Sequence, residues 1–432
     1  MRISKAECGL AREPLLSPFG FKGGYINELW QPAVKLTAVS GAIGVGSGVQ
    51  SVLWSDAEVF RRQGSCGGNA MMLAITARAL ELAREVDWLT PIELLDVMLP
   101  ELTAYARKIC TREDLRLTFV LNALVPVDNA AWMLYAQEKK ITSFADLVPA
   151  EWRTALPARH DRLAAVPLVT YALTDEAISA LAEQGYAMFK IKLGADPAGN
   201  GDRAAMLAWD KERLTRIHQL LSPYRTPHTV SGHIAYYLDA NGRYDTKERL
   251  LRLLDHAEKI GCLDRILLLE EPFAEENEVE VGDLPVTAAA DESAHSDADT
   301  IRRLELGYRA VAVKAIAKTF SMSLKIIRAA SGRAHCFCAD LTVPPVLLEW
   351  NRAVAARLPG LPGMKCGVLE SNGRQNYCRW QELLAYHPHA GADWIEAPDG
   401  IFRLTDAYYR CDGGMLEVPG YYRELAEKGF VK

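Results

Sequence analysis

The sequence lacks the cysteine patterns that disulfide frameworks and zinc sites require. Its nine cysteines follow no regular spacing, and Cys336 and Cys338 have no second pair that would complete a zinc site. The chain also lacks an apolar run of the ~18 residues that a membrane span needs, and the segment MRISKAECGLAREPLL has no signal-like apolar region. These absences predict reduced, buried thiols in a cytoplasmic protein without a membrane partner.

No basic block stands out either. The net charge is −6 and the sequence pI is about 5.9, so nucleic acid and anionic membrane surfaces are not expected as partners. With 49% hydrophobic and 24% charged residues, the composition is that of an ordinary globular protein. The chain has 432 residues, which is longer than most domains with a single hydrophobic core. This length predicts about two domains.

From about Val166 onward, the chain repeats one pattern: a short β-prone run, a charge or turn, and an amphipathic helix. The runs are VPLVTYAL, AMFKIKL, AYYLDAN, RILLLEE, VTAAADE, AVAVKAI, HCFCADL and KCGVLES. Near-continuous apolar strands that alternate with helices are typical of a parallel sheet buried on both faces. Eight such units predict a (β/α)8 TIM-type barrel. A doubly wound open sheet is the structural alternative, although charges on its consecutive strands would converge less well.

Residues 1–155 follow a different pattern. WQPAVKLTAVSGAIGVG is typical of two antiparallel strands around a turn, and GNAMMLAITARALELAREV is typical of a helix. We therefore expect an α+β capping domain over residues 1–155 and the barrel over 156–391. The C-terminal segment 392–432 is expected to return to the capping domain.

Five charged side chains each close one of the apolar runs, where an unpaired charge is costly to bury. They are Lys192, Asp239, Glu270, Asp291 and Lys314. The carboxyl ends of barrel strands form the active-site face, so these side chains are expected to converge there. Three hard oxygen ligands without a nearby His or Cys cluster suit Mg²⁺. The sequence therefore predicts a magnesium site between two lysine bases.

The KIK run places Lys190 and Lys192 on one face of a strand, because side chains alternate along it. Two ammonium groups so close are expected to lower each other's pKa, which would make one of them a general base near neutral pH. Lys318, four residues after Lys314, is expected to be solvated. His295, four residues after the Asp that closes the fifth run, is expected on a loop.

In this order, the runs KIK, LDANGRY, LEEP, ADES and VAVKAIAK resemble the enolase superfamily. The similarity is to its mandelate racemase/muconate lactonizing enzyme branch, specifically the muconate-lactonizing-enzyme and dipeptide-epimerase-like members with a lysine on each side of the site. It covers nearly the whole chain, since PFGFKGGY and VSGAIGVG resemble the opening strands of that family's capping domain.

The resemblance implies a role for each charge. The acid/base pair would be Lys192 and Lys314, with Lys190 tuning Lys192. The Mg²⁺ ligands and their supporting amide would be Asp239, Glu270, Asp291 and Asn241. The family pattern places the second ligand two residues before the proline of LEEP, which selects Glu270 over Glu271.

The implied chemistry is abstraction of the proton α to a carboxylate, with Mg²⁺ neutralising the enediolate that forms. Two bases on opposite faces allow return of the proton from the other side, or expulsion of a β-group. A racemase or epimerase of an N-acyl amino acid or dipeptide-like substrate is favoured. An acid-sugar-type dehydratase or cycloisomerase is the alternative, and a non-catalytic binding or scaffold barrel is the alternative of another class. Members of the family are commonly homo-oligomers, although the sequence itself indicates no oligomeric state.

The chain departs from the family where substrate would be recognised. It lacks the His–Asp base pair of the mandelate racemase branch, and KTFS stands where relatives carry glycines. The eighth run offers Glu370 and Asn372 in place of the Asp-x-Asp of dipeptide epimerases. Asp340 and Glu370 are therefore expected to set specificity. Phe21 lies in the glycine-containing segment 19–25, which resembles the capping loop that closes over substrate.

Overall fold

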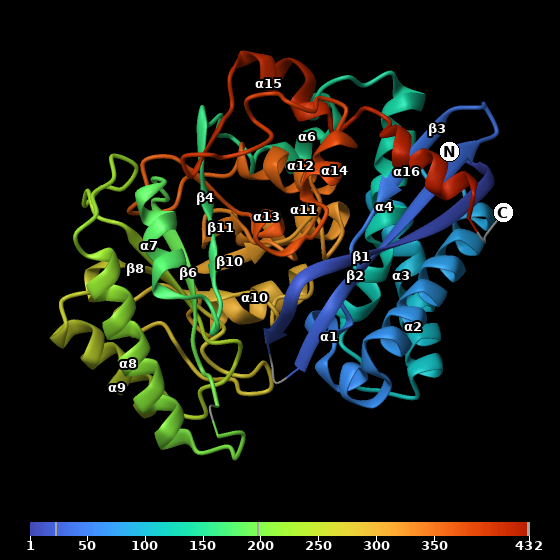
Figure 1. Cartoon of the computed structure of the whole chain (residues 1–432). Helices are drawn as coiled ribbons and strands as arrows, with labels where there is room; N and C mark the ends of the chain where they lie inside the picture. The colour runs from blue at the N-terminus through green and yellow to red at the C-terminus, as the bar shows by residue number, and fades with distance from the viewer. Residues whose placement is uncertain (22–23, 197, 430–432) are drawn as a thin grey trace.

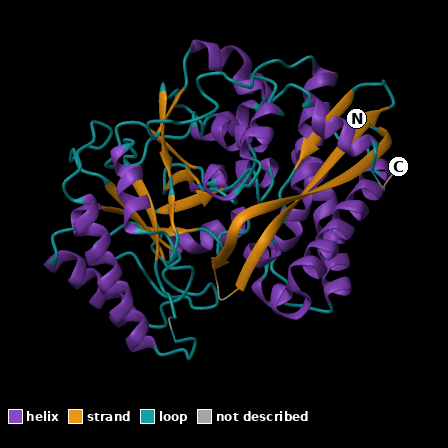
Figure 2. Cartoon of the chain, viewed as in Figure 1, coloured by secondary structure: helices purple, strands orange, loops and turns teal. Residues whose placement is uncertain are grey.

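The structure is a computed structural model that describes residues 1–21, 24–196 and 198–429. It contains one sheet of three strands and one of ten, with helices around both (Figures 1 and 2). The three-stranded sheet and the long N-terminal helices lie together on one side of the molecule, beside both termini. The ten-stranded sheet and its helices form the other side (Figure 1).

The capping region begins with an antiparallel sheet, in which β2 pairs with both other strands. The strands are β1 (Ile3–Phe21), β2 (Gly24–Ala38) and β3 (Ile43–Ser47). Two glycines of β3 allow close approach of the helix over residues 117–139. A Cβ atom at Gly44 would lie 2.0 Å from the Ala130 carbonyl oxygen, and one at Gly46 would lie 2.2 Å from that of Pro126. The glycine-rich run is therefore a strand packed tightly on a helix.

Long helices pack against this sheet. They are α2 (Ala57–Glu85), α3 (Pro91–Cys110) and α4 (Leu117–Lys139), preceded by the single turn α1 (Val52–Ser55). Local capping sets their starts. The Asp56 carboxylate accepts the Val59 N–H at the start of α2, and the Thr90 hydroxyl accepts the Glu93 N–H at the start of α3.

Helix α4 is long and apolar enough to cross a membrane by length and composition. Of its most apolar window, however, 94% is buried inside the protein. That degree of burial is typical of a core helix, which is apolar all round because other elements surround it.

The ten-stranded sheet contains a closed ring of eight strand positions. In the order β4-β12-β11-β10-β9-β8-β7-β6-β5, neighbouring strands are parallel, and β4 and β5 are two parts of one segment. Because β4 pairs with β12 and β5 pairs with β6, the ring closes. The strands are β4 (Arg162–Val166), β5 (Leu168–Val169), β6 (Met188–Lys192), β7 (Ala235–Asp239), β8 (Ile266–Glu270), β9 (Ala288–Ala290), β10 (Ala310–Val313), β11 (His335–Cys338) and β12 (Gly367–Glu370).

Helices follow most of these strands and surround the barrel (Figure 2), whereas the connection from β8 to β9, all within the described residues, contains no helix. The longer ones are α7 (Asp175–Glu183), α8 (Arg203–Leu221), α9 (Lys247–Lys259), α10 (Asp297–Glu305), α11 (Phe320–Ala330) and α12 (Pro345–Ala355). Shorter helices in the connections are α5 (Phe144–Leu147), α6 (Ala150–Arg153), α13 (Gly373–Asn376), α14 (Trp380–Ala385) and α15 (Asp406–Cys411). This alternation confirms the predicted class, a (β/α)8 barrel with an N-terminal α+β capping region.

The first barrel strand differs from the predicted run VPLVTYAL. It begins at Arg162 and leaves the sheet after Val169. Pro167 interrupts it, because proline has no N–H to donate to a neighbouring strand.

The C-terminal segment 392–432 contacts both parts of the molecule. Strand β13 (Ile401–Arg403) pairs antiparallel with β4 and extends the barrel sheet, whereas α16 (Gly420–Glu427) packs on β1 and β2. Only the α16 part therefore returns to the capping sheet within the described residues. The boundaries at 155/156 and 391/392 stay predictions.

A buried carboxylate joins capping helix α4 to barrel helix α11. Asp128 Oδ2 accepts the backbone N–H of Phe320 at 2.8 Å and that of Ser321 at 3.1 Å, and Oδ1 accepts the Ser321 hydroxyl. Trp132 Nε1 donates to the same hydroxyl oxygen at 2.9 Å. Burial raises the pKa of Asp128 to about 7. Lys314 lies between β10 and α11 in the chain. This joint therefore fixes the capping region over the side of the barrel mouth that carries Lys314.

Replacing Asp128 with alanine is expected to lower the free energy of unfolding by roughly 2–4 kcal/mol, because the donors at the start of α11 lose their acceptor. Urea denaturation followed by circular dichroism measures this change. Asp128→Asn is the matched control: it keeps an acceptor oxygen and is expected to cost less. An alanine variant as stable as the unchanged protein would contradict the joint.

The stability that depends on Asp128 is also expected to vary with pH. Its pKa is raised in the folded chain from an ordinary 3.8 to about 7, so the folded chain binds this proton more tightly than the unfolded chain does. The contribution of the group is therefore full below about pH 4 and is lost as the pH rises to about 7. Asp128→Asn cannot titrate, so its free energy of unfolding should rise by roughly 4 kcal/mol relative to that of the unchanged protein between pH 4 and pH 8. If the difference in unfolding free energy between the two proteins stays constant over this pH range, the prediction is wrong.

Candidate active site

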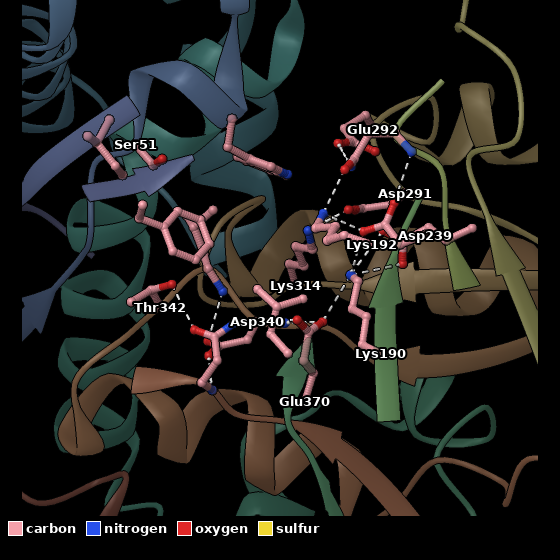
Figure 3. A pocket seen from close by; sticks show the side chains of 18 of the residues that line it. Ser51, Lys190, Lys192, Asp239, Asp291, Glu292, Lys314, Asp340, Thr342 and Glu370 are labelled. Atoms are coloured by element: carbon pink, nitrogen blue, oxygen red, sulfur yellow. Dashed lines mark hydrogen bonds and ion pairs between the residues drawn. The ribbon is translucent and has the colours of Figure 1, made fainter. Parts of the chain in front are cut away.

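The charged side chains that close the barrel strands converge at one mouth of the barrel. Lys192, Asp239 and Glu270 end β6, β7 and β8, and they are register partners across the sheet. Asp291 and Lys314 directly follow β9 and β10. Parallel strands in register bring their terminal side chains to one level. All five line one cavity, and Figure 3 shows four of them labelled around it.

Lys190 lies at the centre of this charged cluster. Its Nζ atom is 3.1 Å from Glu270 Oε1, 3.2 Å from Asp239 Oδ2 and 3.2 Å from Glu370 Oε2. Burial alone would lower the pKa of Lys190, but these carboxylates raise it well above its ordinary value. The expectation that Lys190 and Lys192 lower each other's pKa is therefore wrong for Lys190, because the carboxylates outweigh one ammonium group.

Lys192 extends to the cavity beside the end of β7. Its Nζ atom lies 2.6 Å from Asp239 Oδ2 and 2.7 Å from Asn241 Oδ1. Arg213 fixes the strand end, since its Nε donates to the Lys192 carbonyl oxygen at 3.1 Å. Asn241 Nδ2 in turn donates to Glu292 Oε1 at 3.0 Å. Asn241 thus connects the predicted base to the acidic side of the cavity.

Lys314 is buried on the opposite side of the barrel mouth. Its Nζ atom is 2.5 Å from Asp291 Oδ2 and 4.6 Å from the ring centre of Trp54. Burial lowers the pKa of Lys314, and Asp291 more than offsets this, so the pKa is raised. This lysine is therefore held as an ammonium group between a carboxylate and an aromatic face.

Lys318 is fully buried, so the expectation of a solvated side chain is wrong. Its backbone N–H donates to the Lys314 carbonyl oxygen at 2.8 Å. The chain therefore makes one helical turn after β10 and places both lysines on one side. Lys318 Nζ donates to the carbonyl oxygens of Asp291 at 2.7 Å and Ala294 at 3.0 Å. Burial lowers the pKa of Lys318.

A group of three buried carboxylates can hold a divalent cation. Oxygen atoms of Glu270, Asp291 and Glu292 all lie within 4.8 Å of one another. Asp291 Oδ1 has no hydrogen-bond partner within the described residues and lies 3.3 Å from Lys318 Nζ. Asp239, a predicted ligand, lies outside this group and contacts two lysines instead. Sequence reasoning missed Glu292 because it considered only the charge that closes each run.

Glu271 makes different contacts from its neighbour Glu270. Its Oε1 atom accepts the backbone N–H groups of Asp291 at 2.6 Å and Ser293 at 2.8 Å, and the Ser293 hydroxyl at 2.6 Å. These bonds fix the loop after β9. Glu270, by contrast, lines the cavity. The choice of Glu270 over Glu271 as a metal ligand stays a prediction.

Polar residues after β11 and β12 form another wall of the cavity (Figure 3). Asp340 Oδ2 accepts the Asn372 N–H at 2.8 Å, and the Thr342 hydroxyl donates to Asn372 Oδ1 at 2.7 Å. Burial, reinforced by the charge of Glu370, raises the pKa of Asp340 to about 7. The structure therefore brings the predicted specificity residues together, while their roles stay predictions.

The capping region closes the cavity. Its side chains there are Leu15, Phe19, Ile26, Leu29, Ser51 and Trp54. About 50 Å³ of free space remains in the cavity. The predicted contact Phe21 has a side chain outside the described part of the structure. His295 does not line the cavity and contacts Glu275 Oε2 at 2.8 Å.

No protein-family model and no curated protein matches the chain. Solved structures do match over nearly its whole length. A mandelate racemase/muconate lactonizing protein from Herpetosiphon aurantiacus has a TM-score of 0.63 at 17% identity, covering 94% of this chain and 96% of that one. A dipeptide epimerase from Enterococcus faecalis, complexed with Mg and a dipeptide, has a TM-score of 0.60 at 15% identity and coverages of 94% and 98%.

An N-succinyl Arg/Lys racemase from Bacillus cereus also matches, with a TM-score of 0.60, 16% identity, and coverages of 88% and 89%. At these identities the likeness concerns the fold. The chain therefore has the fold of the enolase superfamily, in the form found in mandelate racemase/muconate lactonizing enzyme proteins. The resemblance read from the sequence is confirmed at this level.

The ligand assignment can be tested by Mg²⁺ binding, measured by titration calorimetry. We expect Asp239→Asn, Glu270→Gln and Asp291→Asn each to weaken Mg²⁺ binding at least about tenfold, because each removes a charged oxygen donor. Glu278→Gln, at the surface, is the matched control and should bind as the unchanged protein does.

Glu292→Gln resolves the difference between the predicted ligands and the observed carboxylate group. If Asp239→Asn leaves the Mg²⁺ affinity intact while Glu292→Gln reduces it, Asp239 is not a ligand and Glu292 takes its place. Unchanged affinity in all four variants would remove the metal site from this cavity.

Proposed function

We propose that the protein is a Mg²⁺-dependent isomerase that removes the proton α to a carboxylate and returns a proton from the opposite face. The arrangement of the two lysines carries this proposal. Strand β6, which ends in Lys192, and strand β10, which precedes Lys314, lie four positions apart in a ring of eight. They therefore face each other across the barrel mouth, and each contacts a carboxylate at the cavity.

The carboxylates of Glu270 and Asp291, with Asp239 or Glu292, would hold the Mg²⁺. When bound, the ion would supply the positive charge that stabilises a substrate carboxylate as it becomes an enediolate. A donor set made only of buried oxygen atoms fits this ion rather than a softer metal.

The lysines would move the proton. An unprotonated Lys192 takes the α-proton from one face, and a protonated Lys314 gives a proton to the other face; for the opposite isomer the two exchange roles. Lys190 stays protonated, because three carboxylates surround it, and it holds Glu270 and Asp239 in place. Side chains of the capping region keep water from the intermediate.

The favoured substrate is an N-acyl amino acid or a dipeptide-like compound. Two observations support this class. Solved structures of similar fold include dipeptide epimerases and an N-succinyl Arg/Lys racemase. In addition, Asp340, Glu370 and Asn372 line the cavity, and their side-chain oxygens are of the kind that can accept an amide N–H.

A dehydratase of an acid sugar is the second candidate. The observation in its favour is Asp340, whose pKa burial raises to about 7, so that it can carry a proton near a leaving hydroxyl group. Both candidates share the first step and a small carboxylate partner. A cytoplasmic setting agrees with nine free cysteines.

Incubation in D₂O with Mg²⁺ and a panel of N-acyl amino acids, dipeptides and aldonic acids tests the proposal by mass spectrometry. We expect α-deuteration without loss of water. In Lys192→Ala, turnover should fall at least about a hundredfold, and exchange should persist only for the isomer whose proton faces Lys314. In Lys314→Ala, only the other isomer should exchange.

Lys428→Ala, which removes an exposed lysine, is the matched control and should racemise normally. Loss of water in place of exchange favours the dehydratase. If no compound reacts, and Lys192→Ala binds Mg²⁺ and ligands as before, the barrel is a binding or scaffold protein.

A further inference from the structure

Trp54 lines the cavity and carries an unused hydrogen-bond donor. It lies on α1 of the capping region, is 5% exposed and lines the cavity with the charged strand ends. Its Nε1 atom is buried and has no hydrogen-bond partner within the described residues. A buried donor without a partner costs about 1–3 kcal/mol, and natural proteins rarely keep one without a reason.

Other buried indoles put this observation in context. Trp132 Nε1 has a partner, the Ser321 hydroxyl oxygen. Trp88 and Trp394 also have no partner for Nε1 among the residues that the structure describes, but neither lines the cavity. Trp54 therefore combines a free donor with a place where a ligand is expected.

The ring of Trp54 also covers the proposed proton donor. Its centre is 4.6 Å from Lys314 Nζ, and strand β10, which precedes Lys314, lies four positions from β6 in the ring of eight. A group bound at this indole would therefore lie beside Lys314.

Buried hydrogen bonds hold the turn that carries Trp54. The Ser51 N–H donates to Asn122 Oδ1 at 3.0 Å, and the Val52 N–H donates to Asn69 Oδ1 at 3.3 Å. The Ser55 hydroxyl donates to the Ser51 carbonyl oxygen at 2.8 Å. The turn is thus preorganised on the capping helices, and so is the donor.

We propose that Trp54 is a substrate-contacting residue whose Nε1–H donates to a second oxygen atom of the substrate, beyond its reacting carboxylate. The proposal deepens the proposed function, on which it rests. The oxygen belongs to the acyl or peptide carbonyl group of an N-acyl amino acid or dipeptide. The same contact places the α-carbon beside Lys314 and requires the capping region to be closed over the substrate.

The test compares Trp54→Phe with the unchanged protein on an N-acetyl amino acid and its N-thioacetyl counterpart, whose sulfur is a weak acceptor. The unchanged, Mg²⁺-loaded protein should prefer the oxygen compound at least about tenfold in kcat/KM. Trp54→Phe keeps an aromatic ring over Lys314 but no donor, so this preference should vanish while the pH profile of kcat stays the same. Trp88→Phe, which removes a buried unpartnered donor elsewhere, should keep the preference.

Equilibrium binding of the two compounds to the Mg²⁺-loaded proteins gives the same comparison without turnover. A preference that is equal in Trp54→Phe and the unchanged protein overturns the role of Trp54. Binding with the expected preference but without proton exchange contradicts the proposed function and leaves Trp54 supported. If the unchanged protein binds neither compound, the assignment of Trp54 to an acyl oxygen is wrong.

Discussion

The burial of charge at the barrel mouth is the constraint on which the rest of the structure depends. Lys190, Asp239, Glu270, Asp291 and Lys314 are each no more than 3% exposed. Buried charges of this kind cost several kcal/mol unless opposite charges lie beside them. The pairs form only if successive strands end at one level, so the barrel register and the charge pairing require each other.

The capping region is needed for the same reason. Its side chains separate the charged strand ends from bulk water, which strengthens every interaction among them. The region is held at Asp128, which bonds the start of α11, and at α1, which carries Trp54 to Lys314. Closure and charge burial are therefore parts of one arrangement, although the residues involved lie far apart in the sequence.

Much of this arrangement could be predicted from local pattern. The sequence alone shows apolar runs that end in a charge, and it shows their alternation with helices. This pattern predicts that Lys192, Asp239 and Glu270 lie at strand ends. Lys318 could not be placed, because its burial depends on a single turn after β10 that no periodic pattern marks. Trp54 lies on a short turn, where sequence carries no signal of which wall it faces. The raised pKa of Lys190 could not be predicted from the sequence, because it depends in part on Glu370, which reaches Lys190 from the eighth barrel strand.

Carboxylates that contact the two lysines also include one that could hold a cation. Lys192 contacts Asp239 through Oδ2, and Lys314 contacts Asp291 through Oδ2, while Asp291 also belongs to the group of carboxylates that can hold a cation. In the proposed function, metal binding and proton transfer would therefore depend on the same carboxylates. It follows that a substitution at Asp291 changes both the charge available to a cation and the surroundings of Lys314. Separate measurement of metal affinity and proton exchange is what distinguishes these two effects.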